Sequence, residues 1–261
     1  MNRLVLKSPG EIVTMDEANR ILREILSALR PMIRPGVTTE EIDSFVERRI
    51  REAGGSSAFK GYPHRGDGHD FPGSVCTSLN SEVVHGVPSS RVVLSEGDIL
   101  SVDVGILYHG YYGDAAETFP VGRISPEAET LLRVTREALD LGVEQVRAGN
   151  RVSDIGYAVQ RHVEAHGFSV VREFVGHGIG SRLHEEPLVP NFGQPGRRDR
   201  LVPGMVLAIE PMVNAGGPEV LLSAEDGWTA RTRDGSLSAH FELCVAVTET
   251  GPRVLGQSAR A

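Results

Sequence analysis

Three apolar runs of this chain each contain one acidic residue. Asp103 lies in Ile-Leu-Ser-Val-Asp-Val-Gly, Glu210 in Val-Leu-Ala-Ile-Glu-Pro-Met-Val, and Glu242 in His-Phe-Glu-Leu-Cys-Val-Ala-Val. An unpaired carboxylate in an apolar core is costly or becomes neutral, so such positions call for a cationic partner. Because lysine and arginine are largely missing from these runs, a metal ion is the remaining compact source of positive charge. Each acid taken alone could instead face solvent on a half-exposed strand.

Two further residues fit a metal site. Asp114 follows Asp103 by eleven residues, across a glycine-containing stretch that suits a hairpin and would bring both acids close together. Asp114 could equally cap a turn. His177 stands in Phe-Val-Gly-His-Gly-Ile-Gly, where flanking glycines let the backbone approach a bound group and leave the imidazole unobstructed.

These five residues together predict the number of metal ions. Four carboxylates and one neutral imidazole carry a charge of about −4, which two divalent ions would neutralise and one would not. We therefore expect a dinuclear site made by Asp103, Asp114, His177, Glu210 and Glu242. Oxygen-rich ligation with one nitrogen favours Mn, Fe or Co, and leaves zinc open.

Helices and strands must position these ligands. Capping signals and apolar spacing predict helices at residues 16–34 behind a Thr14-x-x-Glu17 box, after Pro35-Gly36 behind a Thr38-x-x-Glu41 box, from Ser125-Pro126 to near Gly149, and at 153–167. Runs of β-branched residues predict strands at 74–79, 99–106, 170–175, 205–213 and 241–247. The pattern is α+β with antiparallel strands, because no strict βαβ alternation occurs.

The helical pattern recurs along the chain. A shift of 113 residues places Gly36 on Gly149 and Gly54 on Gly167, and several apolar positions also coincide. Chance or generic amphipathicity would also produce some of these matches. We expect one catalytic domain over residues 1–261, with halves of roughly 14–120 and 125–250 and the site in the cleft between them.

Composition sets further limits. A chain of 261 residues that is 40% hydrophobic can bury one sizeable core, as one domain or two fused halves. A net charge of −8 argues against a broad nucleic-acid-binding face. The N-terminal apolar stretch is too short for a secretion signal or membrane span, so we expect a cytoplasmic protein. Cys76 and Cys244 fit reduced, buried thiols better than a disulfide framework.

Five motifs occur in the order and at the spacing of a known family. They are residues 74–80 leading to 83–88, residues 101–105 with Gly113-Asp114, residues 176–180 with 184–187, residues 209–212, and Trp228 leading to 238–242. With these motifs the chain resembles the type I methionine aminopeptidases of the pita-bread metallopeptidase superfamily over nearly its whole length. The resemblance implies two pseudo-symmetric halves whose helices cover an antiparallel sheet, with a dinuclear metal site in the central cleft.

The resemblance also implies a role for each site residue. Asp103, Asp114 and Glu242 would hold one metal, and Asp114, His177, Glu210 and Glu242 the other. Glu210 would act as general base on a metal-activated water, His184 would stabilise the oxyanion, and His85 would contact the substrate backbone. Both histidines could instead have only supporting or surface roles.

The substrate pocket is implied by the same resemblance. Its lining would be Tyr62, Phe71, Cys76, Leu183 and Trp228, an apolar and polarisable set that suits a thioether, although aromatic residues are also ordinary core. The chain departs from the family at Phe59, where a cysteine is common, at Leu183, where an aromatic is common, and in an inserted loop at residues 64–70. His64 and His69 in that polar loop are typical of a solvated segment rather than a metal site.

The expected reaction is hydrolytic removal of the initiator methionine from nascent proteins and peptides, preferably when the second residue is small. A related Xaa-Pro aminopeptidase or prolidase usually carries a separate N-terminal domain, whereas only about fifteen residues precede the first predicted helix here. A non-catalytic binding protein would be expected to have lost metal ligands. The expected partners are N-terminal peptides of nascent proteins, with ribosome docking left open, and the expected state is a monomer.

Overall fold

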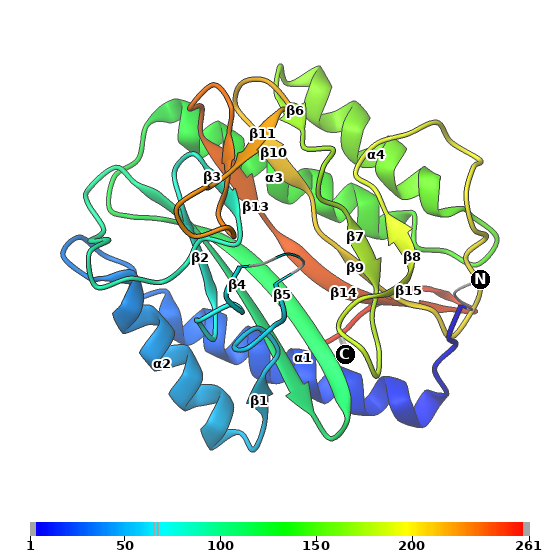
Figure 1. Ribbon diagram of the computed structural model, residues 1–261. Coiled ribbons are helices and arrows are strands. Elements are labelled where there is room, and N and C mark those ends of the chain that lie inside the picture. Colours follow the sequence, from blue (N-terminus) through cyan, green and yellow to red (C-terminus); the bar gives the residue numbers. More distant parts are fainter. Residues whose placement is uncertain (1–3, 65, 67, 258–261) are drawn as a thin grey trace.

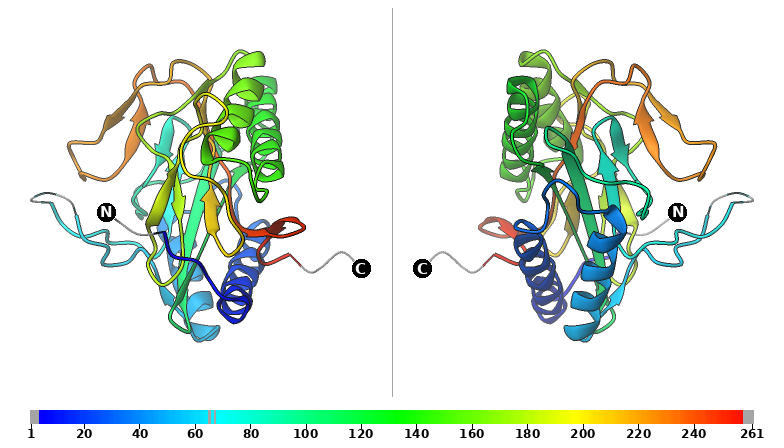
Figure 2. Two further views of the ribbon diagram at one scale, coloured as in Figure 1. Left: turned by 90° about the vertical axis from the view of Figure 1, so that its right-hand side faces the viewer. Right: turned by 90° about the vertical axis from the view of Figure 1, so that its left-hand side faces the viewer.

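Four helices and a curved antiparallel sheet form the described part of this computed structural model, which is residues 4–64, 66 and 68–257 (Figure 1). The helices are α1 (Pro9–Leu29), α2 (Thr39–Glu52), α3 (Pro126–Glu144) and α4 (Val152–Ala165). Helices α1, α3 and α4 lie on one side of the sheet (Figure 2). The segment around residues 60–70 and the hairpin of β11 (Val220–Leu222) and β12 (Ala230–Thr232) project from the opposite side.

The main sheet joins strands from both parts of the chain. Its order is β1 (Ser56–Ser57), β4 (Ile99–Tyr108), β5 (Tyr111–Pro120), β14 (Glu242–Thr248), β9 (Val206–Ile209), β7 (Gly176–Gly178) and β8 (Glu185–Val189), with β15 (Gly251–Val254) on β14 and β2 (Cys76–Leu79) on β4. Two smaller sheets have the orders β13 (Ser238–His240), β10 (Met212–Asn214), β6 (Ser169–Val170), and β11, β12, β3 (Glu82–Val84). Each ladder is antiparallel, as expected from the sequence.

Helix starts follow the capping chemistry, although the predicted start of α1 and the predicted ends of α1 and α3 differ from the structure. Helix α2 begins after Thr38, which exchanges capping hydrogen bonds with Glu41, as predicted. Helix α1 begins at Pro9, seven residues before the predicted start, because Ser8 and Glu11 form the capping box. The predicted box at Thr14 is wrong, since the Thr14 hydroxyl donates to the Gly10 carbonyl inside the helix. Helices α1 and α3 also end five residues before their predicted limits.

The two helix pairs share features at the 113-residue offset. Helix α2 and helix α4 match at both ends with this offset. Gly36 and Gly149 have φ values of 89° and 97°, and Gly54 and Gly167 have φ values of 81° and 79°. Left-handed backbone of this kind favours glycine, which explains why the four glycines recur. The division into halves at 14–120 and 125–250 within one domain stays a prediction.

Two predicted strands differ from the structure. The run at 205–213 divides at Glu210-Pro211 into β9 and β10, which belong to different sheets. Proline has no backbone N–H to donate and therefore breaks the ladder there. The predicted strand at 170–175 is reduced to the two residues of β6. Glu210 thus stands where the chain leaves the main sheet.

The apolar faces of the helices supply most of the core. One cluster joins α1 and α2 to β4 and β5 through residues such as Leu22, Ile42 and Val104. Another joins α3 and α4 to β9 and β14 through residues such as Leu139 and Ile155. Burial of each such side chain contributes roughly 1.5–3 kcal/mol to the free energy of folding. This packing fixes the strands that carry the acids against the helices. No helix among the described residues is long and apolar enough to span a bilayer.

Candidate active site

The β4–β5 hairpin brings the first two acids together. Asp103 pairs with Ala116 and Asp114 pairs with Gly105, so the two acids lie on the same face of the sheet, two positions apart. Their carboxyl groups are close enough for each to perturb the pKa of the other. The predicted hairpin is therefore confirmed, and Asp114 is not a turn cap.

Neighbouring strands bring the remaining residues to the same face. Glu242 on β14 also pairs with Ala116, which places it in the same cross-strand row as Asp103. His177 on β7 pairs with Ala208 of β9, two residues before Glu210 at the end of that strand. The five predicted ligands, from five sequence segments, thus converge, and ligand atoms of Asp114, His177 and Glu242 lie within 4.8 Å of one another.

The acids lack cationic partners from the protein. Burial raises the pKa of Asp103 to about 7, and burial together with neighbouring carboxylates raises the pKa of Asp114 and Glu242 well above their usual range. The pKa of Glu210 is also raised well above its usual range, first by burial and then by Asp103. Among the described ion pairs, none joins these acids to lysine or arginine. The negative charge of these four acids can therefore be neutralised only by bound protons or by a cation from outside the described chain.

His177 presents one ring nitrogen to the acids. Its Nδ1 donates to the Gly178 carbonyl at 2.9 Å, which leaves the Nε2 lone pair free. Nε2 lies 3.8 Å from Asp114 Oδ2 and 3.5 Å from Glu210 Oε1. Burial, followed by the charge of His184, lowers the pKa of His177 to about 3, so the ring is neutral near pH 7. A ring held this way by a backbone carbonyl is typical of a metal ligand.

Buried oxygen atoms test whether a metal fits. Asp103 Oδ1, Asp114 Oδ1 and Glu242 Oε1 are each buried without a hydrogen-bond partner among the described residues. Such orphaned acceptors are rare in proteins unless water or an ion completes them. Carboxylate oxygens and a neutral imidazole nitrogen are ligands for divalent metals, so the residues present fit a metal centre.

The glycines beside His177 serve strand packing. A Cβ on Gly176 would collide with the Ala208 carbonyl, and a Cβ on Gly178 with the Glu186 carbonyl. Our expectation that they open the backbone to a bound group is wrong. They allow β7 to lie close between β8 and β9, which fixes the imidazole over the acids.

The two candidate catalytic histidines border the acid cluster differently. The His184 ring is exposed and lies edge-on to His177, with ring centroids 4.4 Å apart. Its Nδ1 is 2.8 Å from the Tyr62 hydroxyl. His85 has a left-handed backbone with φ of 61°, which is uncommon outside glycine, and its ring packs edge-on against Phe174. His184 is therefore adjacent to the candidate ligand His177, and His85 directly follows β3 in a left-handed backbone conformation.

The predicted pocket residues come together in one apolar cluster. Phe71, Cys76 and Leu183 are buried in it, and Tyr62 and Trp228 pack against it. Phe71 and Trp228 meet edge-on with centroids 5.3 Å apart. Phe59, the departure from the family pattern, is buried in the same cluster. Phe59 therefore packs in the same cluster as the candidate pocket residues.

The described residues of the loop at 64–70 are largely exposed, but two of them contact Trp228 of the apolar cluster. His64 meets the Trp228 ring edge-on at 5.1 Å, and its Nδ1 accepts the Gly66 amide. The Trp228 indole donates to the His69 carbonyl at 2.9 Å. The solvated loop expected from the sequence is therefore anchored on a pocket residue. Positions 65 and 67 lie outside the described residues.

His240 was missed by sequence reasoning. It is fully buried, and its Nε2 lies 3.8 Å from Glu210 Oε2 without a hydrogen-bond partner among the described residues. Burial, then the charge of His85, lowers the pKa of His240 to about 3. Its place two residues before Glu242 was a weak signal, because alternate residues share a face only along a continuous strand, and β13 ends at His240 whereas β14 begins at Glu242.

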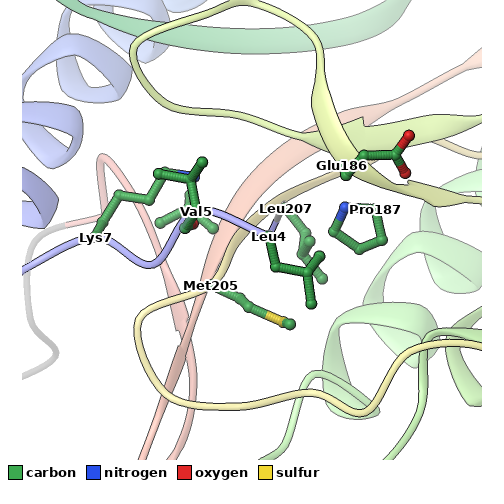
Figure 3. A pocket seen from close by; sticks show the side chains of 8 residues that line it. Leu4, Val5, Lys7, Glu186, Pro187, Met205 and Leu207 are labelled. Atoms are coloured by element: carbon green, nitrogen blue, oxygen red, sulfur yellow. The ribbon is translucent and has the colours of Figure 1, made fainter. Parts of the chain in front are cut away.

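A buried ion pair supports the segment that carries His184. Lys7 Nζ lies 2.6 Å from Glu185 Oε2, and both side chains are almost completely buried. The Glu185 Oε1 atom accepts the Arg182 amide. Figure 3 shows the N-terminal segment, with Leu4 and Lys7, passing beside Pro187 and Leu207. The sequence offered no signal for this contact, since the partners are 178 residues apart.

Comparisons with known proteins agree with this geometry. The model of metallopeptidase family M24 matches residues 13–249. A methionine aminopeptidase of Clostridium perfringens is 49% identical over 252 residues, covering 97% of this chain and 98% of its own. The crystal structure of a Thermotoga maritima methionine aminopeptidase superposes with a TM-score of 0.94 at 41% identity, covering 98% of this chain and 100% of that one.

The chain therefore belongs to metallopeptidase family M24, and its fold is the pita-bread fold expected from the sequence. Within the family, the resemblance to methionine aminopeptidases is confirmed. A prolidase of Pyrococcus horikoshii has a TM-score of 0.75 at 22% identity, with 98% of this chain and 64% of that chain covered. That likeness shows a shared fold alone.

Proposed function

We propose that this chain is a metal-dependent methionine aminopeptidase that removes the N-terminal methionine from proteins and peptides, preferably when the second residue is small. The observation that carries the proposal is identity of 41–49% over nearly the whole chain to relatives that are named methionine aminopeptidases. The convergence of Asp103, Asp114, His177, Glu210 and Glu242 supports the same conclusion, because an aminopeptidase of this family requires a metal centre.

The proposed metal centre contains two divalent ions, with cobalt, manganese, iron or zinc as candidates. Asp103, Asp114 and Glu242 would hold one ion, and Asp114, His177, Glu210 and Glu242 the other. When bound, such ions polarise the scissile carbonyl and lower the pKa of water. The charge of about −4 on the deprotonated ligands supports two ions rather than one.

Glu210 is the proposed general base. It stands at the end of β9, with its carboxylate 13% exposed, beside His177 and His240. A partly exposed carboxylate at the edge of the acid cluster can accept a proton from water and deliver it to the leaving amine. Asp114 on β5 and Glu242 on β14 are more fully buried and are suited to metal ligation.

His184 is the proposed oxyanion donor, with its tautomer set by Tyr62. If the Tyr62 hydroxyl donates to Nδ1, the proton of the neutral ring resides on Nε2. That N–H can donate to the developing oxyanion. His85, whose ring packs edge-on against Phe174, would contact the substrate backbone.

The apolar cluster of Tyr62, Phe71, Cys76, Leu183 and Trp228 is the proposed methionine pocket. Aromatic rings and a thiol favour a thioether through dispersion and sulfur–aromatic contacts. Phe59 fills volume in the same cluster and would narrow the pocket towards an unbranched side chain. In this proposal the enzyme acts as a cytoplasmic monomer on nascent N-termini, with the ribosome as the partner it would meet there.

Peptide hydrolysis tests the function. Protein stripped of metal and reloaded with Mn²⁺ or Co²⁺ should cleave Met-Ala-Ser and leave Ala-Pro-Phe intact. Preference for Ala-Pro-Phe would overturn the methionine specificity in favour of an Xaa-Pro peptidase. Inactivity of every metal form on both peptides would favour a binding protein.

A further inference from the structure

Helices α3 and α4 carry a second group of metal-ligating side chains. Glu137 lies on α3, His162 and His166 lie on α4, and one ligand atom from each falls within 4.8 Å of the others. The two histidines are four residues apart and so share one face of α4. These helices cover the side of the sheet opposite the projecting segments (Figure 2), so the group is separate from the proposed catalytic centre.

One distance within the group, that between His162 and Glu137, is close to that of a tetrahedral site. His162 Nε2 lies 3.0 Å from Glu137 Oε2, and the two imidazole centroids are 4.6 Å apart. Metal–ligand bonds of ~2.0–2.1 Å place neighbouring tetrahedral ligand atoms roughly 3.3 Å apart. The three ligand atoms lie within 4.8 Å of one another, so side-chain rotations would bring all three onto one ion. All three residues are half-buried or exposed, so an ion can reach them.

The hydrogen bonds prepare one histidine for ligation. His166 Nδ1 lies 2.9 Å from the His162 carbonyl, so Nδ1 must be the donor and the lone pair resides on Nε2. A ring N–H bonded to a backbone carbonyl is the common arrangement behind a ligating imidazole. His162 Nε2 faces the Glu137 carboxylate, and an ion would replace the proton between them.

We propose that Glu137, His162 and His166 form a binding site for one borderline divalent cation, such as Zn²⁺, that links α3 to α4. Two imidazole nitrogens and one carboxylate oxygen favour Zn²⁺, Cu²⁺ or Ni²⁺ over Mg²⁺ or Mn²⁺, in contrast to the oxygen-rich acid cluster. The fourth position is open to water. The corresponding positions at the 113-residue offset are Glu24, Arg49 and Ala53, so the site belongs to one helix pair only.

Arg133 limits the affinity of this site. Its guanidinium bonds both Glu137 carboxylate oxygens at 2.9 Å, and its positive charge opposes a cation there. Removal of that charge by Arg133→Gln should tighten Zn²⁺ binding at this site severalfold. The substitution lies on an exposed helix face and leaves the catalytic residues untouched.

Metal counting tests the proposal. Equilibrium dialysis against Zn²⁺, read by atomic absorption, should give one ion per chain more for the unsubstituted protein than for the variant with both His162→Gln and His166→Gln. His109→Asn is the matched control, because it removes an exposed histidine at a turn whose φ of 48° asparagine tolerates. This control should bind as many ions as the unsubstituted protein. Equal stoichiometry for the double variant would overturn the proposal.

A structural readout keeps the test independent of folding and of activity. A crystal of the unsubstituted protein soaked in Zn²⁺ should show an anomalous peak between α3 and α4. The single variant His166→Gln, at an exposed position, should lose that peak while keeping those of the acid cluster. Absence of the peak in the unsubstituted protein would overturn the assignment, whatever the outcome for methionine hydrolysis.

Discussion

Two clusters in this molecule bury charge in different ways. Glu185 has its own cation, because Lys7 reaches it at 2.6 Å and both side chains are at most 3% exposed. Within the described part of the chain, the ion pairs of the acid cluster, Asp103, Asp114, Glu210 and Glu242, involve His177 and His240 alone, and burial lowers the pKa of both rings to about 3. Where the chain supplies the cation, a buried charge holds segments together. Where it does not, the excess negative charge can select metal ions.

The two clusters are also linked through one segment. Glu185 follows His184 and begins β8, and it pairs with Lys7, which directly precedes the Ser8 cap of α1. A structural ion pair thus fixes the backbone beside the proposed oxyanion donor. Substitutions that separate stability from metal binding can test this division.

The largest effect is expected from removing charge in the acid cluster. Asp114→Asn should lower turnover by roughly 10³ or more, because metal ions contribute several kcal/mol of charge stabilisation and Asp114 is proposed to bind both. Metal content should fall in parallel, as measured by atomic absorption on dialysed protein. The control Asp199→Asn changes an exposed acid and should keep both activity and metal. Full metal content in Asp114→Asn would contradict the ligand assignment.

Breaking the internal pair should cost stability rather than metal. Lys7→Met leaves Glu185 buried without its cation and should lower the free energy of unfolding by roughly 3–5 kcal/mol, measured by urea denaturation. The double variant Lys7→Met with Glu185→Leu removes both charges and should recover much of that loss. Metal stoichiometry should stay unchanged in both. If the double variant is as unstable as the single one, packing rather than charge explains the contact.

The proposed oxyanion donor gives the next effect. His184→Ala should lower turnover by roughly 10²–10³, as loss of one such donor does, with metal content unchanged. Tyr62→Phe removes the hydroxyl 2.8 Å from His184 Nδ1 and should cause a smaller loss in turnover. Loss of metal from His184→Ala would show that this ring is a ligand instead.

Chelation should destabilise the protein in a pH-dependent manner. Removing metal that is present at about 100 times its dissociation constant lowers the free energy of unfolding by roughly 2.7 kcal/mol. In metal-free protein, burial raises the pKa of Asp103 to about 7 and of the other three acids well above their usual range. The folded state then binds more protons than the unfolded chain, so its stability falls as pH rises.

For Asp103 this loss takes place between the unfolded carboxyl pKa of about 4 and the folded pKa of about 7, and the other three acids add to it. His177 and His240 have lowered pKa values and contribute the opposite slope, but only below the unfolded histidine pKa of about 6.5. Between about pH 6.5 and 7.5, where Asp103 still titrates in the folded protein and the histidines no longer contribute, the metal-free protein should therefore lose thermal stability more steeply than Mn²⁺-loaded protein. Parallel curves for the two forms would contradict the view that metals replace protons on these acids.

Local patterns in the sequence predicted much of the fold and of the acid cluster. The Thr38–Glu41 box predicted the start of α2, and acids within apolar runs predicted residues that meet on one face of the sheet. The predicted start of α1 was wrong because one amphipathic stretch contains two possible capping boxes, at Ser8 and at Thr14. Which box begins the helix depends on how the preceding residues pack.

Long-range contacts could not be predicted in this way. Lys7 and Glu185 are 178 residues apart and belong to no common sequence motif. Their pairing requires the start of β8 to meet the N-terminal segment. The glycines around His177 were assigned to ligand access because a single sequence does not show how closely β7 lies to its neighbours. His240 was overlooked because a residue two before an acid signals a shared face only within a continuous strand. Here β13 ends at His240 and β14 begins at Glu242.

His240 gives the smallest and most discriminating prediction. Its unpaired Nε2 lies 3.8 Å from Glu210 Oε2, so we expect it to be a positioning residue that orders the general base through a hydrogen bond or a shared water. His240→Leu should lower kcat about tenfold with little change in KM, which corresponds to about 1.4 kcal/mol, the range of one net hydrogen bond. His240→Gln keeps a polar group at a similar position and should restore most of kcat. Equal losses in the two variants would show that the ring acts only through packing, and loss of metal from His240→Gln would make His240 a sixth ligand.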